Sequence, residues 1–208
     1  MRPDDLTPVL DALLQPRCER LARDGVTPGM VVGAGTLLSV GVGILVAAGG
    51  ARPWMLLCVP LALLARAAAG RLGAMLHSQY QRGSPLDSLV QDLGALVSEV
   101  ALFWPLARVE GLEAWLVTLC CLLAVLTEFA GVVGLDLGAT RRRDGPLDAT
   151  LRLWVLALIC LLLGVGIDPG WWTSLGFQVL PFLQVWTIVR RLRGAAHELR
   201  APPPSGAP

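Results

Sequence analysis

Apolar residues fill this chain in runs close to 20 residues long, separated by short polar connectors. A run of this length is what an α-helix needs to cross the hydrocarbon core of a bilayer. Six spans are predicted, at about 30–49, 54–77, 86–106, 114–135, 151–167 and 171–189. The pattern therefore predicts an all-α integral membrane protein with six transmembrane helices.

The residues before the first span have a different pattern. Between residues 5 and 24, leucine and valine recur at helical spacing among Asp and Arg, which predicts an amphipathic helix lying on the membrane surface. An ordinary solvated helix is the alternative. Thr27-Pro28-Gly29 is a typical helix start. The predicted organisation is an amphipathic N-terminal segment (1–26), a six-helix membrane domain (27–195) and a disordered Pro-rich tail (196–208).

Composition supports a membrane protein and gives it an orientation. Charged residues make up 16% of the 208 residues, against about 25% in a soluble domain. All 17 basic residues are arginines, and six spans would place every one except Arg52 and Arg108 on one side. By the positive-inside rule this predicts a multi-pass protein of the cytoplasmic (inner) membrane with both termini cytoplasmic. The net charge of +1 gives no basic field for a nucleic acid, so the lipid bilayer is the expected partner.

Ionisable residues inside the predicted spans concentrate between residues 66 and 99. Such residues are costly in a membrane and usually functional. Asp92 and Glu99 are seven residues apart and share a helix face, whereas Asp87 lies about 140° from Asp92 around the helix. Together with Arg66 they form a candidate polar cluster, in which Arg66 and Arg71 are the expected cations. Two interpretations remain open: ion pairs that hold the fold, or a metal or substrate site built from Asp87, Asp92 and Glu99.

Three further sets of polar residues have weaker signals. Glu128, near the end of the fourth span, is expected to form a buried helix–helix hydrogen bond. His77 is interpreted as a polar helix-end residue, with a catalytic base as the alternative. The cluster of Arg141, Arg142 and Arg143 suits a lipid headgroup phosphate or an anionic substrate, or simply marks the cytoplasmic side.

The layout and several motifs resemble the CDP-alcohol phosphatidyltransferase family of integral membrane enzymes. The shared features are the surface helix, the six spans, the Thr-Pro before the first span, and the segments ALFWPLA, LTEFAGVVG and RRRDGP. Members carry the signature Asp-x2-Asp-Gly-x2-Ala-Arg-x8-Gly-x3-Asp-x3-Asp across the second and third spans. The resemblance implies that its four aspartates hold two divalent cations, usually Mg²⁺, against the pyrophosphate of a CDP-linked donor, with the last aspartate as base. It also implies a homodimer.

Aligned without gaps, the signature is degenerate in this chain. Its conserved positions fall on Gly70, Gly73, Ala74, His77, Ser78, Asp87, Gln91 and Ala95. The four aspartates are thus replaced by Gly70, Gly73, Gln91 and Ala95, so no catalytic residue and no bound metal or other cofactor is predicted. A second register matches Gly83 and Asp87, but it leaves Asp92 one residue too late for the last aspartate.

Two functions remain open at this point. The first is a divergent phosphatidyltransferase of phospholipid biosynthesis, which would transfer a substituted phosphate from a CDP-linked lipid or CDP-alcohol to a hydroxyl acceptor. The second is a non-catalytic pseudoenzyme that binds lipid or nucleotide, or partners an active membrane enzyme. The resemblance favours the first, and the missing ligand oxygens favour the second.

Overall fold

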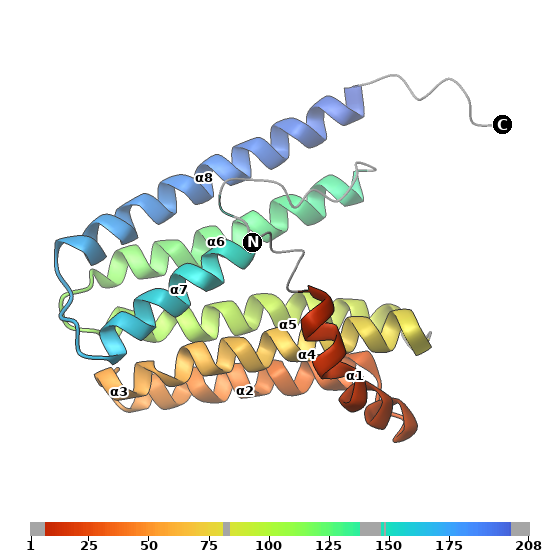
Figure 1. The fold of residues 1–208 in the computed structure, drawn as a ribbon. Coiled ribbons are helices and arrows are strands. Elements are labelled where there is room, and N and C mark those ends of the chain that lie inside the picture. The colour runs from red at the N-terminus through yellow and green to blue at the C-terminus, as the bar shows by residue number, and fades with distance from the viewer. Residues whose placement is uncertain (1–6, 81–83, 138–146, 148, 201–208) are drawn as a thin grey trace.

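All regular structure in the described part of the chain is helical. The computed structural model describes residues 7–80, 84–137, 147 and 149–200, and no strand occurs among them (Figure 1). The elements are α1 (Thr7–Arg23), α2 (Pro28–Ala48), α3 (Pro53–Leu56), α4 (Cys58–Tyr80), α5 (Pro85–Phe103), the 3₁₀ helix η2 (Trp104–Arg108), α6 (Ala114–Asp136), α7 (Ala149–Gly164) and α8 (Trp171–Arg200). The all-α prediction is confirmed for these residues.

Four stretches within the described residues are long and apolar enough to cross a membrane. They are Pro28–Ala48, Pro53–Tyr80, Leu86–Arg108 and Ala114–Val133, which match the first four predicted spans. The fifth predicted span is α7, a shorter apolar helix of 16 residues. The sixth belongs to α8, whose 30 residues continue to Arg200 and so include 196–200 of the predicted tail. A multi-pass membrane protein is therefore supported, and the count of six stays a prediction.

The helices form two packed groups, with α7 between them. In Figure 1, α2, α4 and α5 lie together, α6 lies along α8, and α7 crosses between these groups. One apolar core joins the groups, with fully buried members such as Leu56, Leu102, Val117, Leu156 and Phe177. Because this cluster has members in both groups, the two groups belong to one folded unit.

Small residues allow the close approach of α2 to its neighbours. Gly35, Ser39 and Gly43 recur every fourth residue and are buried on one face of α2. A side chain at Gly43 would collide with the backbone carbonyl of Ala101 in α5, so only glycine permits this contact. At the other end of this face, Gly35 packs against Ala69 of α4. Close backbone packing through small residues is the usual way in which membrane helices associate.

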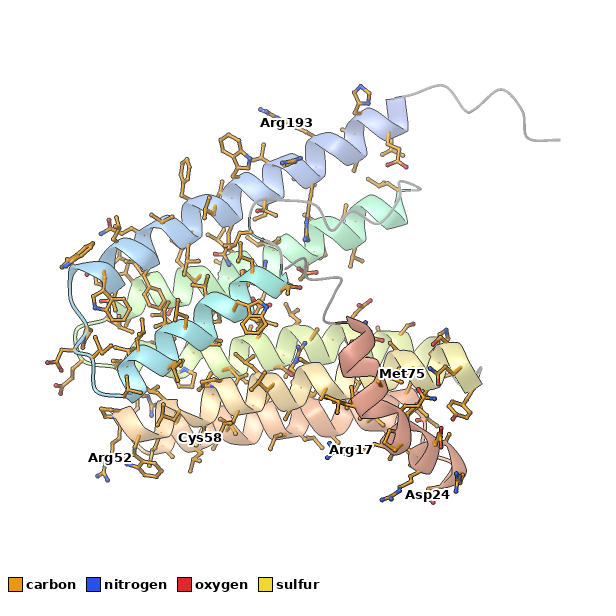
Figure 2. All side chains as sticks on the ribbon, in the orientation of Figure 1. Arg17, Asp24, Arg52, Cys58, Met75 and Arg193 are labelled. Carbon is orange, nitrogen blue, oxygen red and sulfur yellow. The ribbon has the colours of Figure 1, made fainter. Side chains whose placement is uncertain are left out.

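The N-terminal helix packs across the end of α4. Leu14, Cys18 and Ala22 are spaced by four residues and form a small buried cluster with Met75 and Leu76. The helix itself was predicted, and its position on a membrane surface stays a prediction. Figure 2 shows Arg17, Asp24 and Met75 at this end of the bundle, with Arg52 and Cys58 at the opposite end.

Capping interactions explain where α2 and α5 begin. Thr27 precedes Pro28, and its hydroxyl accepts a hydrogen bond from the Met30 amide at 3.3 Å. Ser84 and Asp87 form a reciprocal capping box, in which each side chain accepts a hydrogen bond from the other's backbone amide. The second carboxylate oxygen of Asp87 accepts a hydrogen bond from the Gly29 amide at 3.0 Å. Asp87 therefore ties the start of α5 to the start of α2.

Candidate ligand pocket

A pocket of about 490 Å³ lies in one half of the helical bundle. It is bounded by the N-terminal halves of α2 and α7, by the C-terminal halves of α6 and α8, and by the middle of α4 and of α5. Its charged and amide side chains are Arg66, Gln91, Asp92, Glu99, Glu128 and Arg191. Most other lining residues are apolar. The volume and the mixture of apolar walls with a few polar groups are typical of a site for a small organic ligand.

Three of the four positions aligned with metal-binding aspartates line this pocket. Gly70 of α4 and Gln91 and Ala95 of α5 are part of its wall, and we call these three residues with Arg66 the motif wall. The fourth position, Gly73, is buried against Val32 of α2. The remaining aligned residues of α4, which are Ala74, His77 and Ser78, are exposed and lie outside the lining. Asp87 is also outside the lining, in the α5 capping box.

The motif wall does not fit a two-metal centre. Glycine and alanine have no ligand atoms, and Gln91 has a single neutral carbonyl oxygen, whereas Mg²⁺ sites use carboxylates. Among the described residues, no group of three or more His, Cys, Asp or Glu side chains is placed to hold a metal ion. The donor set that the resemblance assigns to the metal is therefore missing from the place where it would be needed.

A network of four charged residues stands beside the motif wall. Arg152 of α7 is 1% exposed and forms a two-point ion pair with Glu99 of α5, with Nε–Oε1 2.6 Å and Nη2–Oε2 3.0 Å. Its Nη2 also approaches Oε1 of Glu128 in α6 at 3.4 Å. Arg191 of α8 lies 3.5 Å from the same Glu128 oxygen and donates a hydrogen bond to the Thr127 carbonyl at 2.8 Å. We call Glu99, Glu128, Arg152 and Arg191 the polar network.

The polar network is balanced in charge and joins the two helix groups. Two carboxylates face two guanidinium groups, each from a different helix. Buried ions are tolerated when they are paired and hydrogen-bonded, as Glu99 and Arg152 are here. One part of the pair is left unsatisfied, because the buried Nη1 of Arg152 has no hydrogen-bond partner among the described residues. The network therefore holds α5 against α6, α7 and α8 at the pocket.

The structure brings together some of the candidate residues and separates others. Arg66, Asp92 and Glu99 line one pocket, and Asp87 does not. Glu128, expected to bond between helices, does so with Arg152 and Arg191. His77 is exposed at the end of α4. The cluster Arg141–Arg143 lies outside the described residues.

Arg152 and Arg191 were missed as partners in the pocket. Both stand at the ends of predicted spans, where arginine is usually a topological signal. The sequence did contain one indication of such partners. Glu99 and Glu128 lie within predicted spans, and each needs a cation from another helix. Sequence spacing does not say which helix supplies it, because that depends on how the helices are arranged.

Comparisons with known proteins agree with this fold. No protein-family model matches the chain. The inner membrane protein YnbA of Escherichia coli (strain K12) is 28% identical over 190 residues, which cover 90% of this chain and 93% of that protein.

Two crystal structures of the phosphatidylinositol phosphate synthase PgsA1 of Mycobacterium tuberculosis are similar to this chain. One has CDP-DAG bound and matches with a TM-score of 0.73, over 93% of this chain and 96% of that chain. The other contains manganese and citrate and matches with a TM-score of 0.74, over 93% and 92%. Identity is 18% in both, so the likeness shows the fold. PgsA1 is a CDP-alcohol phosphatidyltransferase, so the resemblance seen in the sequence is confirmed at the level of the fold.

Proposed function

We propose that this protein is a CDP-alcohol phosphatidyltransferase-like membrane protein of phospholipid metabolism that binds a CDP-linked lipid or a related ligand without metal-dependent transfer. The observation that carries the proposal is the motif wall, in which the three positions aligned with metal-binding aspartates, Gly70, Gln91 and Ala95, line a ligand-sized pocket and supply no carboxylate to it. Their joint presence there also favours the ungapped alignment. The second register depends on Asp87, which is used in a helix cap instead.

The chemistry of the transfer explains why the missing carboxylates matter. Moving a substituted phosphate from a CDP-linked donor leaves negative charge on the departing nucleotide. Bridging cations stabilise such charge by several kcal/mol, which a neutral amide does not replace. The two glutamates at the pocket do not substitute for them, since Glu99 and Glu128 are already engaged with Arg152 and Arg191.

The proposed topology has six transmembrane helices, with α7 and α8 as the fifth and sixth. In this topology the half of the bundle that holds the pocket is cytoplasmic. This half lies toward the end where Figure 2 shows Arg17, and Arg52 is at the opposite end. In this arrangement α1 is an amphipathic helix at the cytoplasmic membrane surface. We further propose a homodimer, as the resemblance implies, which sedimentation in detergent would test.

An active phosphatidyltransferase is the second candidate. The fold extends over 93% of this chain, and the PgsA1 structure has CDP-DAG bound. Asp92 also keeps one carboxylate in the pocket lining. These observations favour a ligand of the same class, and they leave Asp92 as the pocket carboxylate that is not part of the polar network.

One experiment separates the two candidates. The full-length protein is purified into nanodiscs, and CMP release from CDP-diacylglycerol is measured with Mg²⁺ or Mn²⁺ across a panel of alcohols. Binding of CDP-diacylglycerol is followed in parallel as a shift in thermal stability. We expect binding without CMP release. Turnover that the Asp92→Asn substitution abolishes would overturn the non-catalytic proposal.

A further inference from the structure

Arg66 is a cation of the pocket that the polar network does not neutralise. It lies in α4, within the candidate membrane span Pro53–Tyr80, one helical turn before Gly70. Its side chain lines the pocket, and it forms no hydrogen bond or ion pair within the described residues. An arginine inside a membrane span is costly unless an anion or water compensates it.

The acidic groups around the pocket do not supply that anion. Glu99 attracts Arg66 electrostatically, but both oxygens of its carboxylate accept hydrogen bonds from Arg152. Glu128 stands between Arg152 and Arg191. Asp92 has an interaction of its own. Within the part of the chain that the structure describes, the Arg66 guanidinium in the pocket therefore has no bonded counter-charge.

There is also space for a ligand beside this guanidinium. A Cβ atom added at Gly70 would have no atom within 4 Å, so the position that would hold an aspartate is open. Glycine there lets a ligand approach the α4 backbone closely, one turn from Arg66. Gln91 in the opposite part of the motif wall has amide hydrogens suited to an anionic oxygen.

We propose that Arg66 binds a phosphate or pyrophosphate group of the ligand directly, with no bridging divalent cation. The inference rests on the proposed function and assigns the group that the pocket recognises. A guanidinium donates two parallel hydrogen bonds to phosphate oxygens, and it keeps its charge in an apolar setting. The arginine thus takes the electrostatic place of metal ions for binding, while offering no second cation for transfer chemistry.

The test measures binding to the full-length protein in phosphatidylcholine nanodiscs in the presence of EDTA. Three probes distinguish the source of the phosphate: CMP, inorganic pyrophosphate, and CDP-diacylglycerol in the nanodisc. We expect at least one probe to bind in EDTA. Replacing Arg66 with Met should weaken that binding by at least about tenfold, since hydrogen bonds between charged groups are lost. The affinity of Arg66→Lys should lie between those of the wild type and Arg66→Met, because lysine keeps the charge and loses the two-point contact.

A matched control and a stability measurement exclude a structural role. Arg71→Met removes the same charge from the same helix outside the pocket lining and should leave affinity within about twofold. Without ligand, Arg66→Met should unfold at the same or a higher temperature than the wild type, because an unpaired charge leaves the membrane. A lower unfolding temperature, or a variant that does not fold, would mean that Arg66 serves the fold and would overturn the inference.

The remaining outcomes are equally decisive. Binding that requires Mg²⁺, equal affinity of Arg66→Met and wild type, an equal loss in Arg71→Met, or no binding of any probe in EDTA would each overturn the role of Arg66. Failure of the proposed function is seen separately, as CMP release by the wild type. Release of CMP together with EDTA-resistant, Arg66-dependent binding would leave the inference standing while removing the non-catalytic proposal.

Discussion

The polar network and the motif wall face the same pocket and treat charge in opposite ways. In the network, two glutamates and two arginines from four helices neutralise one another. In the motif wall, the positions aligned with acidic ligands are glycine, glutamine and alanine, and the one charge is that of Arg66, which has no bonded partner among the described residues. The charges that hold the helices together are therefore separate from the groups of the motif wall that would contact a ligand. The bundle and its pocket can therefore persist without the metal ligands.

The largest expected effect comes from breaking the polar network. Arg152→Met leaves the buried carboxylate of Glu99 without its bonded cation and removes one of the two arginines beside Glu128. The cost is expected to be about 3–5 kcal/mol of unfolding free energy. Denaturation of the purified protein by SDS in mixed micelles measures it. The double variant Arg152→Met with Glu99→Leu should recover most of the loss, because the pair is then replaced by apolar groups. A double variant no more stable than the single one would show that the pair does not act as a unit.

The second-largest effect is expected when carboxylates are introduced into the motif wall. The triple variant Gly70→Asp, Gln91→Asp and Ala95→Asp places three carboxylates in the pocket lining. Mn²⁺ at about 100 times its dissociation constant should then raise unfolding free energy by about 2.7 kcal/mol. Gly73 is left unchanged, because an added Cβ would press on Val32 at 3.0 Å.

The control for this variant is the same triple replacement by asparagine, which keeps the shape without the charge. The wild type and the asparagine variant should show no stabilisation by Mn²⁺. A folded aspartate variant that binds no metal would make the ungapped alignment wrong.

A smaller effect is expected at the exposed end of the network. Glu128→Gln removes a carboxylate whose side chain is 31% exposed. Arg152 keeps its pair with Glu99, and Arg191 keeps the Thr127 carbonyl, so the expected loss of stability is about 1–2 kcal/mol. Glu110→Gln, an exposed site outside the network, is the matched control. A loss as large as that of Arg152→Met would mean that Glu128, not Glu99, is the main partner of Arg152.

The smallest effect concerns the helix start beside the motif wall. Ser84→Ala removes one half of the α5 capping box and should cost about 1 kcal/mol. Amide hydrogen exchange should accelerate in the first turn of α5, and at Gly29 if Asp87 loses its position. Unchanged exchange at both places would show that the cap does not set the α2–α5 contact.

Much of the architecture follows from patterns along the chain. The lengths of the apolar runs predicted all four long spans, since bilayer thickness sets the length of a spanning helix. The small residues at Gly35, Ser39 and Gly43 share one face because of helical periodicity, and that face is buried. Helical spacing also separated Asp87 from Asp92 and Glu99 around α5.

The composition of the motif wall could be read from the sequence once the signature was aligned. None of its residues has a carboxylate side chain, whatever the fold. The prediction that no metal binds there therefore followed from the sequence alone. The sequence alone does not give the identity of the ligand or the interaction partner of Asp92. Both depend on which groups from other helices stand opposite.

Side-chain chemistry at each position was thus settled by the sequence, while pairing between helices was decided by the tertiary structure. Glu99 was expected to face Arg66 or Arg71, and it binds Arg152, which is 53 residues away in the chain. That choice depends on how α7 lies between the two helix groups, which no local pattern encodes. Both carboxylate oxygens of Glu99 are bonded to Arg152, so Glu99 does not form an ion pair with Arg66. The packing of α7 therefore also leaves Arg66 available to a ligand.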